Sequence, residues 1–427
     1  MLNFLFLGCH HDDIELGAGI LTQRALAANH SVSWIVLTDD EHGEERHRET
    51  LAAGAELGVA PDRIRFAGLP DGDLTADRAT VGLLRDLDLH PDVVVTHTAA
   101  DSHNDHRAAN ELAFSTYRET IVLQYAIHIS ARFTEFSPRF FIARSEEHLA
   151  HKRRALAAHA TQRERIEKRD RSQFEISLGA LAGLPSAEAF ELSVQVGGER
   201  SLNELMALND APFHSLWYPL IGDRTITLLY EAFLGQPSAI EEYSRQHESV
   251  GRDALRAAFA QHWFPRSPLV ELFSSDPAVD DHLADGDVLL AGSPVNNPVT
   301  GQLISPMPDI RWTIEHDSAR QDVFLYDKIE SRAYHPTRDS DARLRADLGV
   351  FSVMPSPLAP GRTLLSCAGI HGLGTQGLLE FLADPISNRW LLNLLVQRQG
   401  VLNVPVEIDV VDRSLQLFAA EGSAIGR

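Results

Sequence analysis

The chain of 427 residues is two to three times longer than a typical domain of about 150 residues, so a single hydrophobic core is not expected. Hydrophobic residues make up 44% of the chain and charged residues 23%, which is typical of globular proteins and excludes a disordered or fibrous chain. The formal charge of −22 repels polyphosphates and anionic membrane surfaces, so we expect neither nucleic acid nor a membrane as a partner.

The two cysteines, Cys9 and Cys367, each follow an apolar run, which favours buried free thiols in a reducing compartment over a disulfide. We therefore predict a cytoplasmic protein. The apolar start at residues 1–7 has no basic segment and runs directly into polar residues, so it indicates a first strand rather than a signal peptide. No stretch reaches the roughly 18 apolar residues of a membrane span. The sequence does not define an oligomeric state.

Short apolar runs alternate with amphipathic segments over the first 200 residues, a pattern typical of a parallel sheet covered by helices. We expect strands at 2–7, 32–37, 64–66, 93–96, 122–129 and 140–143. We expect helices at 17–28, 45–57, 80–87, from 105 onward, and at 146–159. The sequence therefore predicts an α/β protein whose N-terminal domain has a Rossmann-like parallel sheet.

Periodicity weakens after Gly197 and Gly198, which mark a turn or linker. We place residues 1–197 in the first domain and residues 198–427 in a second α/β domain of unknown family, with an accessory or ligand-sensing role. In this second part we expect a helix at 240–264 and strands at 288–291, 323–326 and 363–368.

A glycine-rich turn follows the last of these strands. Gly372, Gly374 and Gly377 fit the pattern G-x-G-x-x-G, which can hold a phosphate at a helix N-terminus. The acidic residue about 20 positions later that a dinucleotide ribose requires is missing. The turn therefore has two interpretations, a second small-ligand site or a plain backbone requirement for glycine.

Two polar clusters, at residues 10–15 and 101–106, each follow a predicted strand. In a doubly wound sheet with the order 3-2-1-4-5, strands one and four are neighbours, and their carboxyl ends open into one crevice. Single polar residues at strand ends are often caps or turn residues. Two clusters at adjacent strand ends instead favour one shared site.

The residue types in these clusters suit a catalytic metal centre. His10, Asp13 and His106 supply the three N/O ligands that a catalytic zinc ion uses, with a fourth position open to water. Asp12 would face that open position and act as general base. His103 would stabilise an oxyanion, and Asp105 would fix a neighbouring imidazole in one tautomer. We predict one zinc ion per chain.

The two clusters resemble the hallmark runs of the PIG-L/LmbE-like zinc-dependent de-N-acetylases, His-Pro-Asp-Asp-x-Glu and His-x-Asp-His. Here the runs read His-His-Asp-Asp-Ile-Glu at 10–15 and His-Asn-Asp-His at 103–106. The resemblance covers residues 1 to about 196, including the segments 46–49, 57–59, 69–74, 152–162 and 188–190. It implies the same metal ligands, base and oxyanion residue as above. His11 stands where the family has proline, which removes a fixed φ angle and adds an imidazole.

The resemblance also implies the substrate, a small N-acylated amino sugar or related amide, with Arg46 and Asp71 as contacts. From the residues alone, Arg46 could instead pair with Glu49 one helical turn away, and Asp71 could be a turn residue. A close alternative is an amidase that acts on another N-acyl compound, such as a thiol–sugar conjugate. An alternative of a different class is a regulatory protein that binds a metabolite or nucleotide and carries a weakly active or inactive deacetylase domain.

Overall fold

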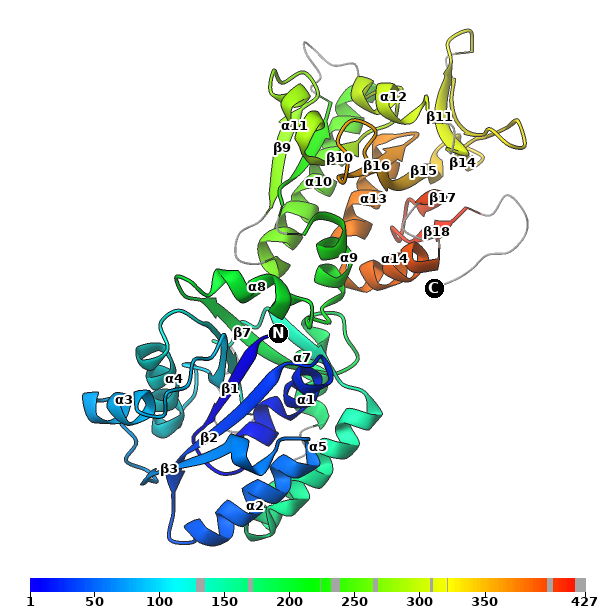
Figure 1. Ribbon diagram of the computed structural model, residues 1–427. Helices are drawn as coiled ribbons and strands as arrows, with labels where there is room; N and C mark the ends of the chain where they lie inside the picture. Colours follow the sequence, from blue (N-terminus) through cyan, green and yellow to red (C-terminus); the bar gives the residue numbers. More distant parts are fainter. Residues whose placement is uncertain are drawn as a thin grey trace. The chain divides into compact units, whose positions relative to one another are not determined.

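The computed structural model describes residues 1–127, 135–167, 172–222, 224–231, 239–263, 268–307, 310–320, 322–397 and 402–418. The chain forms two compact units, Met1–Pro212 and Phe213–Arg427 (Figure 1). The first unit thus extends past the boundary expected at residue 197. Its last segment is held to the first sheet because Asn209 and Asp210 accept hydrogen bonds from the backbone N–H groups of Phe141 (3.0 Å) and Ala143 (2.8 Å).

The first unit is built on a seven-stranded sheet. In sheet order its strands are β3 (Ile64–Pro70), β2 (Ser31–Asp39), β1 (Asn3–Gly8), β4 (Val93–His97), β5 (Ile121–Tyr125), β7 (Ala187–Val194) and β6 (Phe140–Ala143). The strands from β3 to β5 are parallel, and β7 runs antiparallel to both of its neighbours. The expected order 3-2-1-4-5 and the Rossmann-like fold are confirmed. The end of the strand predicted at 122–129 lies outside the described residues.

Helices cover both faces of this sheet. They are α1 (Asp13–Ala27), α2 (Gly43–Glu56), α3 (Arg78–Arg85), α4 (Asn104–Thr116), α5 (Glu146–Ala158), α6 (Arg163–Glu167), α7 (Ser172–Ala180) and, after β7, α8 (Glu199–Met206). Leu5 and Leu7 of β1 share a core with Leu112 of α4. Phe4 and Phe6 point to the opposite face and are also buried. Burial on both faces explains why the strands read as continuous apolar runs.

The second unit is also of the α/β class, as expected. Its main sheet has the order β18 (Leu415–Leu417), β17 (Leu402–Asp409), β15 (Leu344–Pro355), β16 (Thr363–Gly369), β10 (Asp287–Ala291), β8 (Ile226–Tyr230) and β9 (Leu269–Phe273), with β14 (Thr337–Arg338) paired to β15. A small antiparallel sheet contains β11 (Trp312–Asp317), β12 (Asp322–Asp327) and β13 (Arg332–Tyr334). The helices are α9 (Pro212–Ile221), α10 (Ala239–His262), α11 (Val279–Asp285), α12 (Pro298–Ile304), α13 (Gly372–Ala383) and α14 (Pro385–Gln397). No helix among the described residues is both long enough and apolar enough to cross a membrane.

The glycine-rich turn of the second unit is not an open phosphate cradle. The buried carboxylate of Asp347 accepts hydrogen bonds from the backbone N–H groups of His371 (3.1 Å) and Gly374 (2.7 Å) at the N-terminus of α13. This negative charge takes the place that an anion would occupy. The structure therefore does not support the second ligand site expected at Gly372, Gly374 and Gly377.

Close packing accounts for two of these glycines. A Cβ atom on Gly374 would lie 2.8 Å from the Asp347 carboxylate, and one on Gly377 would lie 2.9 Å from Ile408. The backbone interpretation of the turn is therefore the one that the structure favours.

Both thiols are expected to be unreactive in the folded protein. Cys9 and Cys367 are free and fully buried. Burial raises the pKa of Cys9 to about 11 and raises that of Cys367 as well, so neither forms a thiolate near neutral pH. We expect no reaction with Ellman's reagent at pH 8 until denaturant is added, when two thiols per chain should react. A thiol that reacts within seconds in the native protein would contradict this prediction.

Candidate active site

The carboxyl ends of β1 and β4 bring the two polar clusters together. His10 Nδ1 lies 3.1 Å from Asp13 Oδ2 and 3.2 Å from His106 Nε2. His106 Nε2 lies 3.5 Å from the same Asp13 oxygen. His10 follows β1, Asp13 begins α1 and His106 lies in the first turn of α4, so three separate elements point three ligand-type atoms at one position. The structure thus brings together the three residues that the sequence proposed as metal ligands.

The other ring nitrogen of each histidine contacts a carboxylate. His10 Nε2 lies 3.0 Å from Asp71 Oδ1, and His106 Nδ1 lies 2.9 Å from Asp101 Oδ2. When both of these nitrogens carry the proton and donate it, His10 Nδ1 and His106 Nε2 are left unprotonated. Two lone pairs facing each other at 3.2 Å, beside a carboxylate, repel unless a cation lies between them. The donor set and its hydrogen bonds therefore fit a divalent metal ion.

The electrostatics of Asp13 agree with a ligand role. Burial by itself would raise its pKa, but the surrounding imidazoles, led by that of His106, hold the pKa well below its usual range. Asp13 is therefore ionised near neutral pH. One carboxylate oxygen and two imidazole nitrogens form a ligand set typical of zinc.

His97, at the end of β4, is part of this site and is not among the residues that the sequence indicated. Its Nε2 lies 3.2 Å from Asp13 Oδ2 and accepts a hydrogen bond from the Cys9 backbone N–H at 3.2 Å. Its ring stacks on that of His106, with centroids 3.9 Å apart. Burial, with help from neighbouring His106, lowers the pKa of His97 to about 4, so this ring is neutral. His97 packs against Asp13 and His106 and fixes the orientation of the His106 ring. We call His10, Asp13 and His106 the ligand group.

Asp105 does not have the role that the sequence suggested. Its carboxylate accepts hydrogen bonds from the backbone N–H groups of Gly72 (2.7 Å) and Leu74 (3.3 Å), and its shortest approach to His10 Nε2 is 3.9 Å. Asp105 therefore holds the loop after β3. The carboxylates that contact the imidazoles are instead Asp71, on His10, and Asp101, on His106. Asp101 and Asp105 point in different directions because the chain turns into α4 between them.

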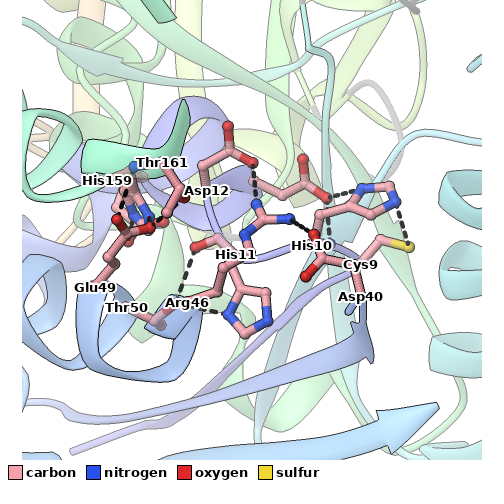
Figure 2. A network of polar contacts seen from close by, with 12 residues as sticks. Cys9, His10, His11, Asp12, Asp40, Arg46, Glu49, Thr50, His159 and Thr161 are labelled. Carbon is pink, nitrogen blue, oxygen red and sulfur yellow. Dashed lines mark hydrogen bonds and ion pairs between the residues drawn. The ribbon is translucent and has the colours of Figure 1, made fainter. Parts of the chain in front are cut away.

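Asp12 and Arg46 lie beside the ligand group. The Asp12 side chain is 6% exposed, and no described residue donates a hydrogen bond to it. Arg46 Nη2 lies 3.9 Å from Asp12 Oδ1, while Arg46 Nη1 donates to Asp40 at 2.9 Å (Figure 2). The expected alternative, a pair between Arg46 and Glu49, is not formed, because Glu49 instead accepts hydrogen bonds from the backbone and hydroxyl of Thr161.

His103 also borders the ligand group. Its ring centroid lies 5.0 Å from that of His10 and 4.6 Å from that of His106. Its Nδ1 atom is buried and has no hydrogen-bond partner in the described part of the chain. Burial lowers the pKa of His103, and the neighbouring His106 lowers it further. The hydrogen-bonding capacity of this His103 nitrogen is therefore not used by the described residues.

Comparison with known proteins identifies the first unit. Residues 5–117 match the PIG-L family model, described as GlcNAc-PI de-N-acetylase. The first unit therefore contains a PIG-L domain over residues 5–117. The resemblance seen in the sequence is thereby confirmed for these residues. A search of curated proteins gives no match.

Several solved structures are similar to the PIG-L domain. A conserved protein from Thermus thermophilus is 28% identical over 46% of this chain and 96% of its own, with a TM-score of 0.39. An N,N'-diacetylchitobiose deacetylase from Pyrococcus horikoshii is 19% identical over 45% of this chain and 84% of its own, with a TM-score of 0.39. A 4-carboxy-2-hydroxymuconate hydratase from Pseudomonas putida is 19% identical over 45% of this chain and 96% of its own, with a TM-score of 0.39.

His11 of the PIG-L domain points away from the ligand group. Figure 2 shows the rings of His10 and His11 turned in different directions. His11 is 1% exposed; its Nδ1 lies 2.9 Å from Thr50 Oγ1, and its Nε2 lies 3.0 Å from Asp39 Oδ1. The His11 imidazole, which stands where the family has proline, is therefore not placed to bind the same ion as His10, Asp13 and His106.

A kink in α1 holds the start of that helix in the PIG-L domain. Ala18 has a non-helical backbone (φ −145°, ψ 23°), so the helical hydrogen bonds around it are broken. The buried Lys152 ammonium donates to the freed carbonyl of Leu16 at 3.1 Å. The Glu188 carboxylate accepts from the freed N–H groups of Ile20 and Leu21, both at 2.9 Å. Two side chains thus replace the missing helical bonds and hold the turn that carries Asp13.

Proposed function

We propose that the PIG-L domain is a metal-dependent de-N-acylase that acts on an N-acylated amino sugar or a related small amide. The observation that supports this proposal is the convergence of His10 Nδ1, Asp13 Oδ2 and His106 Nε2, within 3.5 Å of one another, with carboxylates on the outer nitrogens of both imidazoles. The PIG-L match to a de-N-acetylase family agrees with it. The ion would be zinc, one at this site.

His10, Asp13 and His106 would hold the ion and leave a coordination position open to solvent and substrate. When bound there, a divalent ion would polarise the acyl carbonyl and lower the pKa of the attacking water. Asp101 and Asp71 would keep the two imidazoles in the ligand tautomer.

Asp12 would act as the general base. Its carboxylate is buried next to the ligand group and accepts no hydrogen bond from the described residues, so its lone pairs are available for a proton from the attacking water. The water oxygen forms a bond to the acyl carbon, and the carbon–nitrogen bond then breaks. Asp12 returns its proton to the departing amine nitrogen. His103, whose Nδ1 has no partner in the described chain, would donate to the developing oxyanion.

Arg46 is suited to hold the substrate. The Arg46 side chain is 6% exposed, and its Nε and Nη2 atoms lack hydrogen-bond partners among the described residues. A buried donor without a partner is costly, and a substrate oxygen would satisfy it. The Asp71 side chain, 42% exposed, borders the site but contacts His10, so we assign it first to that ring and second to the substrate.

The test is release of a free amine. Zinc-loaded protein is incubated with N-acetylglucosamine, N,N'-diacetylchitobiose and an N-acyl thiol–sugar conjugate, and primary amine is measured with fluorescamine. We expect release from at least one substrate, loss of activity with a chelator and recovery when zinc is restored. The same rate with and without chelator, or no release from any substrate by zinc-loaded protein, would contradict the proposal. The second result would favour the regulatory alternative.

Asp101→Asn is expected to weaken zinc binding about 10- to 100-fold, because the variant loses the charge that holds His106 in its ligand tautomer. Zinc affinity is measured by competition with a chromophoric chelator. Asp62→Asn, at an exposed position before β3, is the matched control and should leave the affinity unchanged. Equal affinity in Asp101→Asn and in the parent protein would remove Asp101 from this role.

A further inference from the structure

A second group of ligand-type side chains lies on the other side of the loop after β1. His11 Nε2 lies 3.0 Å from Asp39 Oδ1, and His47 Nε2 lies 2.9 Å from the same oxygen. The three residues come from the loop before α1, the end of β2 and the first half of α2. One ligand atom from each lies within 4.8 Å of the others. None of them has a part in the catalytic arrangement described above.

The hydrogen bonds of Thr50 are compatible with an unprotonated Nε2 on His11. The Thr50 hydroxyl donates to the His11 carbonyl oxygen at 3.3 Å, so its own oxygen can accept a proton from His11 Nδ1 at 2.9 Å. In that tautomer the Nε2 lone pair faces the Asp39 carboxylate at 3.0 Å, a repulsive contact that a cation between them would relieve. The competing arrangement, an Nε2–H group donating to Asp39, predicts no metal uptake.

The group repeats the arrangement of the catalytic cluster. Both contain two imidazoles and one aspartate, and in both each imidazole nitrogen lies 2.9–3.5 Å from a single carboxylate oxygen. Thr50 contacts His11 Nδ1, the nitrogen that faces away from the carboxylate oxygen of the group. Asp101 contacts His106 Nδ1 in the same way. Two imidazole nitrogens and a carboxylate oxygen suit zinc, which completes its coordination with water.

The surroundings also permit an ion. The Asp39 and His47 side chains are 24% and 31% exposed, which leaves a path from solvent. Phe66 stacks flat on the His47 ring, with centroids 3.7 Å apart and planes at 13°, and so limits its rotation. The nearby positive charge of Arg46 is paired with Asp40 at 2.9 Å.

We propose that His11, Asp39 and His47 form a second site for a divalent cation of the zinc type. The ion would connect β2 and α2 to the loop that contains Asp12. It would thereby restrain the backbone of this loop, as the fixed φ angle of a proline at position 11 would. This site is separate from the ion of the proposed catalytic reaction.

The test is metal content, measured by elemental analysis after zinc loading and removal of loosely bound metal on a chelating resin. We expect two zinc ions per chain in the parent protein and one in His47→Gln, with the affinity of the second site reduced more than about 100-fold. His42→Gln is the matched control, because His42 lies at the start of the same helix and its side chain is 61% exposed and pairs only with Glu41 among the described residues. It should retain two ions.

Asp13→Asn separates this inference from the proposed function. We expect this variant to keep one ion and lose amine release. One ion in the parent and in His47→Gln, but none in Asp13→Asn, would overturn the second site and leave the proposed function standing. If the parent binds one ion, and that ion is lost in His47→Gln but kept in Asp13→Asn, the site at His11, Asp39 and His47 stands and the metal site of the proposed function is overturned. If circular dichroism shows that His47→Gln is unfolded, His11→Pro, which restores the family residue, is expected to bind one ion; two ions would overturn the site.

Discussion

Replacing Asp12 with asparagine is expected to lower kcat/KM for amine release by about 100-fold or more while zinc content stays the same. Asparagine has nearly the same shape as aspartate but cannot take a proton from the attacking water. Asp12 lies at the N-cap of α1 without a side-chain capping bond, so the substitution should not unfold the helix. The measurements are fluorescamine kinetics and elemental analysis of the same preparation.

Asp73→Asn is the matched control for this experiment. Asp73 is exposed in the loop after β3, close in sequence to Asp71 and Gly72, and makes no hydrogen bond with the described residues that would be lost. The control should keep the parent rate. An Asp12→Asn variant that is as active as the parent would remove Asp12 from the role of base. Loss of zinc together with activity would show instead that Asp12 acts through metal binding.

The position of the site could be predicted from the sequence because it depends on topology. Apolar runs and the polar residues after them locate the carboxyl ends of β1 and β4, and the neighbouring placement of strands one and four follows from the doubly wound order. The proximity of the two polar clusters, at residues 10–15 and 101–106, therefore follows from strand order, without knowledge of any side-chain conformation. The confirmed PIG-L match covers this same region, residues 5–117.

The partners of each ligand could not be predicted because they depend on side-chain direction. His97 comes directly after the strand predicted at 93–96, and nothing in its spacing indicates that its ring stacks on His106. Asp101 and Asp105 are equally plausible partners in sequence. The turn into α4 decides between them, since it points Asp101 at His106 and Asp105 at the loop after β3. The one signal in the sequence that could have indicated a role for His97 is its position, at the carboxyl end of the strand that precedes the second polar cluster.

The second unit shows a different limit of sequence-based prediction. β15 and β17 pair antiparallel in the main sheet although about fifty residues and two helices separate them, and neither strand was expected. The glycine-rich turn has the spacing of a phosphate site, but a carboxylate that is remote in sequence, Asp347, fills its helix N-terminus. A local pattern cannot reveal a group that arrives from another strand.

Replacing Lys152 with methionine is expected to destabilise the first unit by about 3–5 kcal/mol, because it leaves the buried Glu188 without a cation and Glu175 with Arg144 alone. Lys152 is 2% exposed, and its ammonium lies 2.6 Å from Glu188 and 3.0 Å from Glu175. The variant also loses the bond to Leu16 at the kink of α1. The free energy of unfolding is measured by urea denaturation, and zinc binding and amine release are measured on the same protein.

The pH dependence and two further variants test whether this loss has the stated cause. Burial would raise the pKa of Glu175, but Lys152 and then Arg144 lower it, so the stability that Glu175 contributes is present above its ordinary pKa and is lost as the pH falls. Methionine at position 152 should weaken this acid dependence.

Arg153→Met, one residue along α5 and exposed, removes the same charge and should cost less than about 0.5 kcal/mol. Adding Glu175→Gln and Glu188→Gln to Lys152→Met should recover part of the loss, since no uncompensated charge then remains buried. Equal stabilities of the Lys152→Met and Arg153→Met proteins would show that the buried cation does not hold the kink of α1.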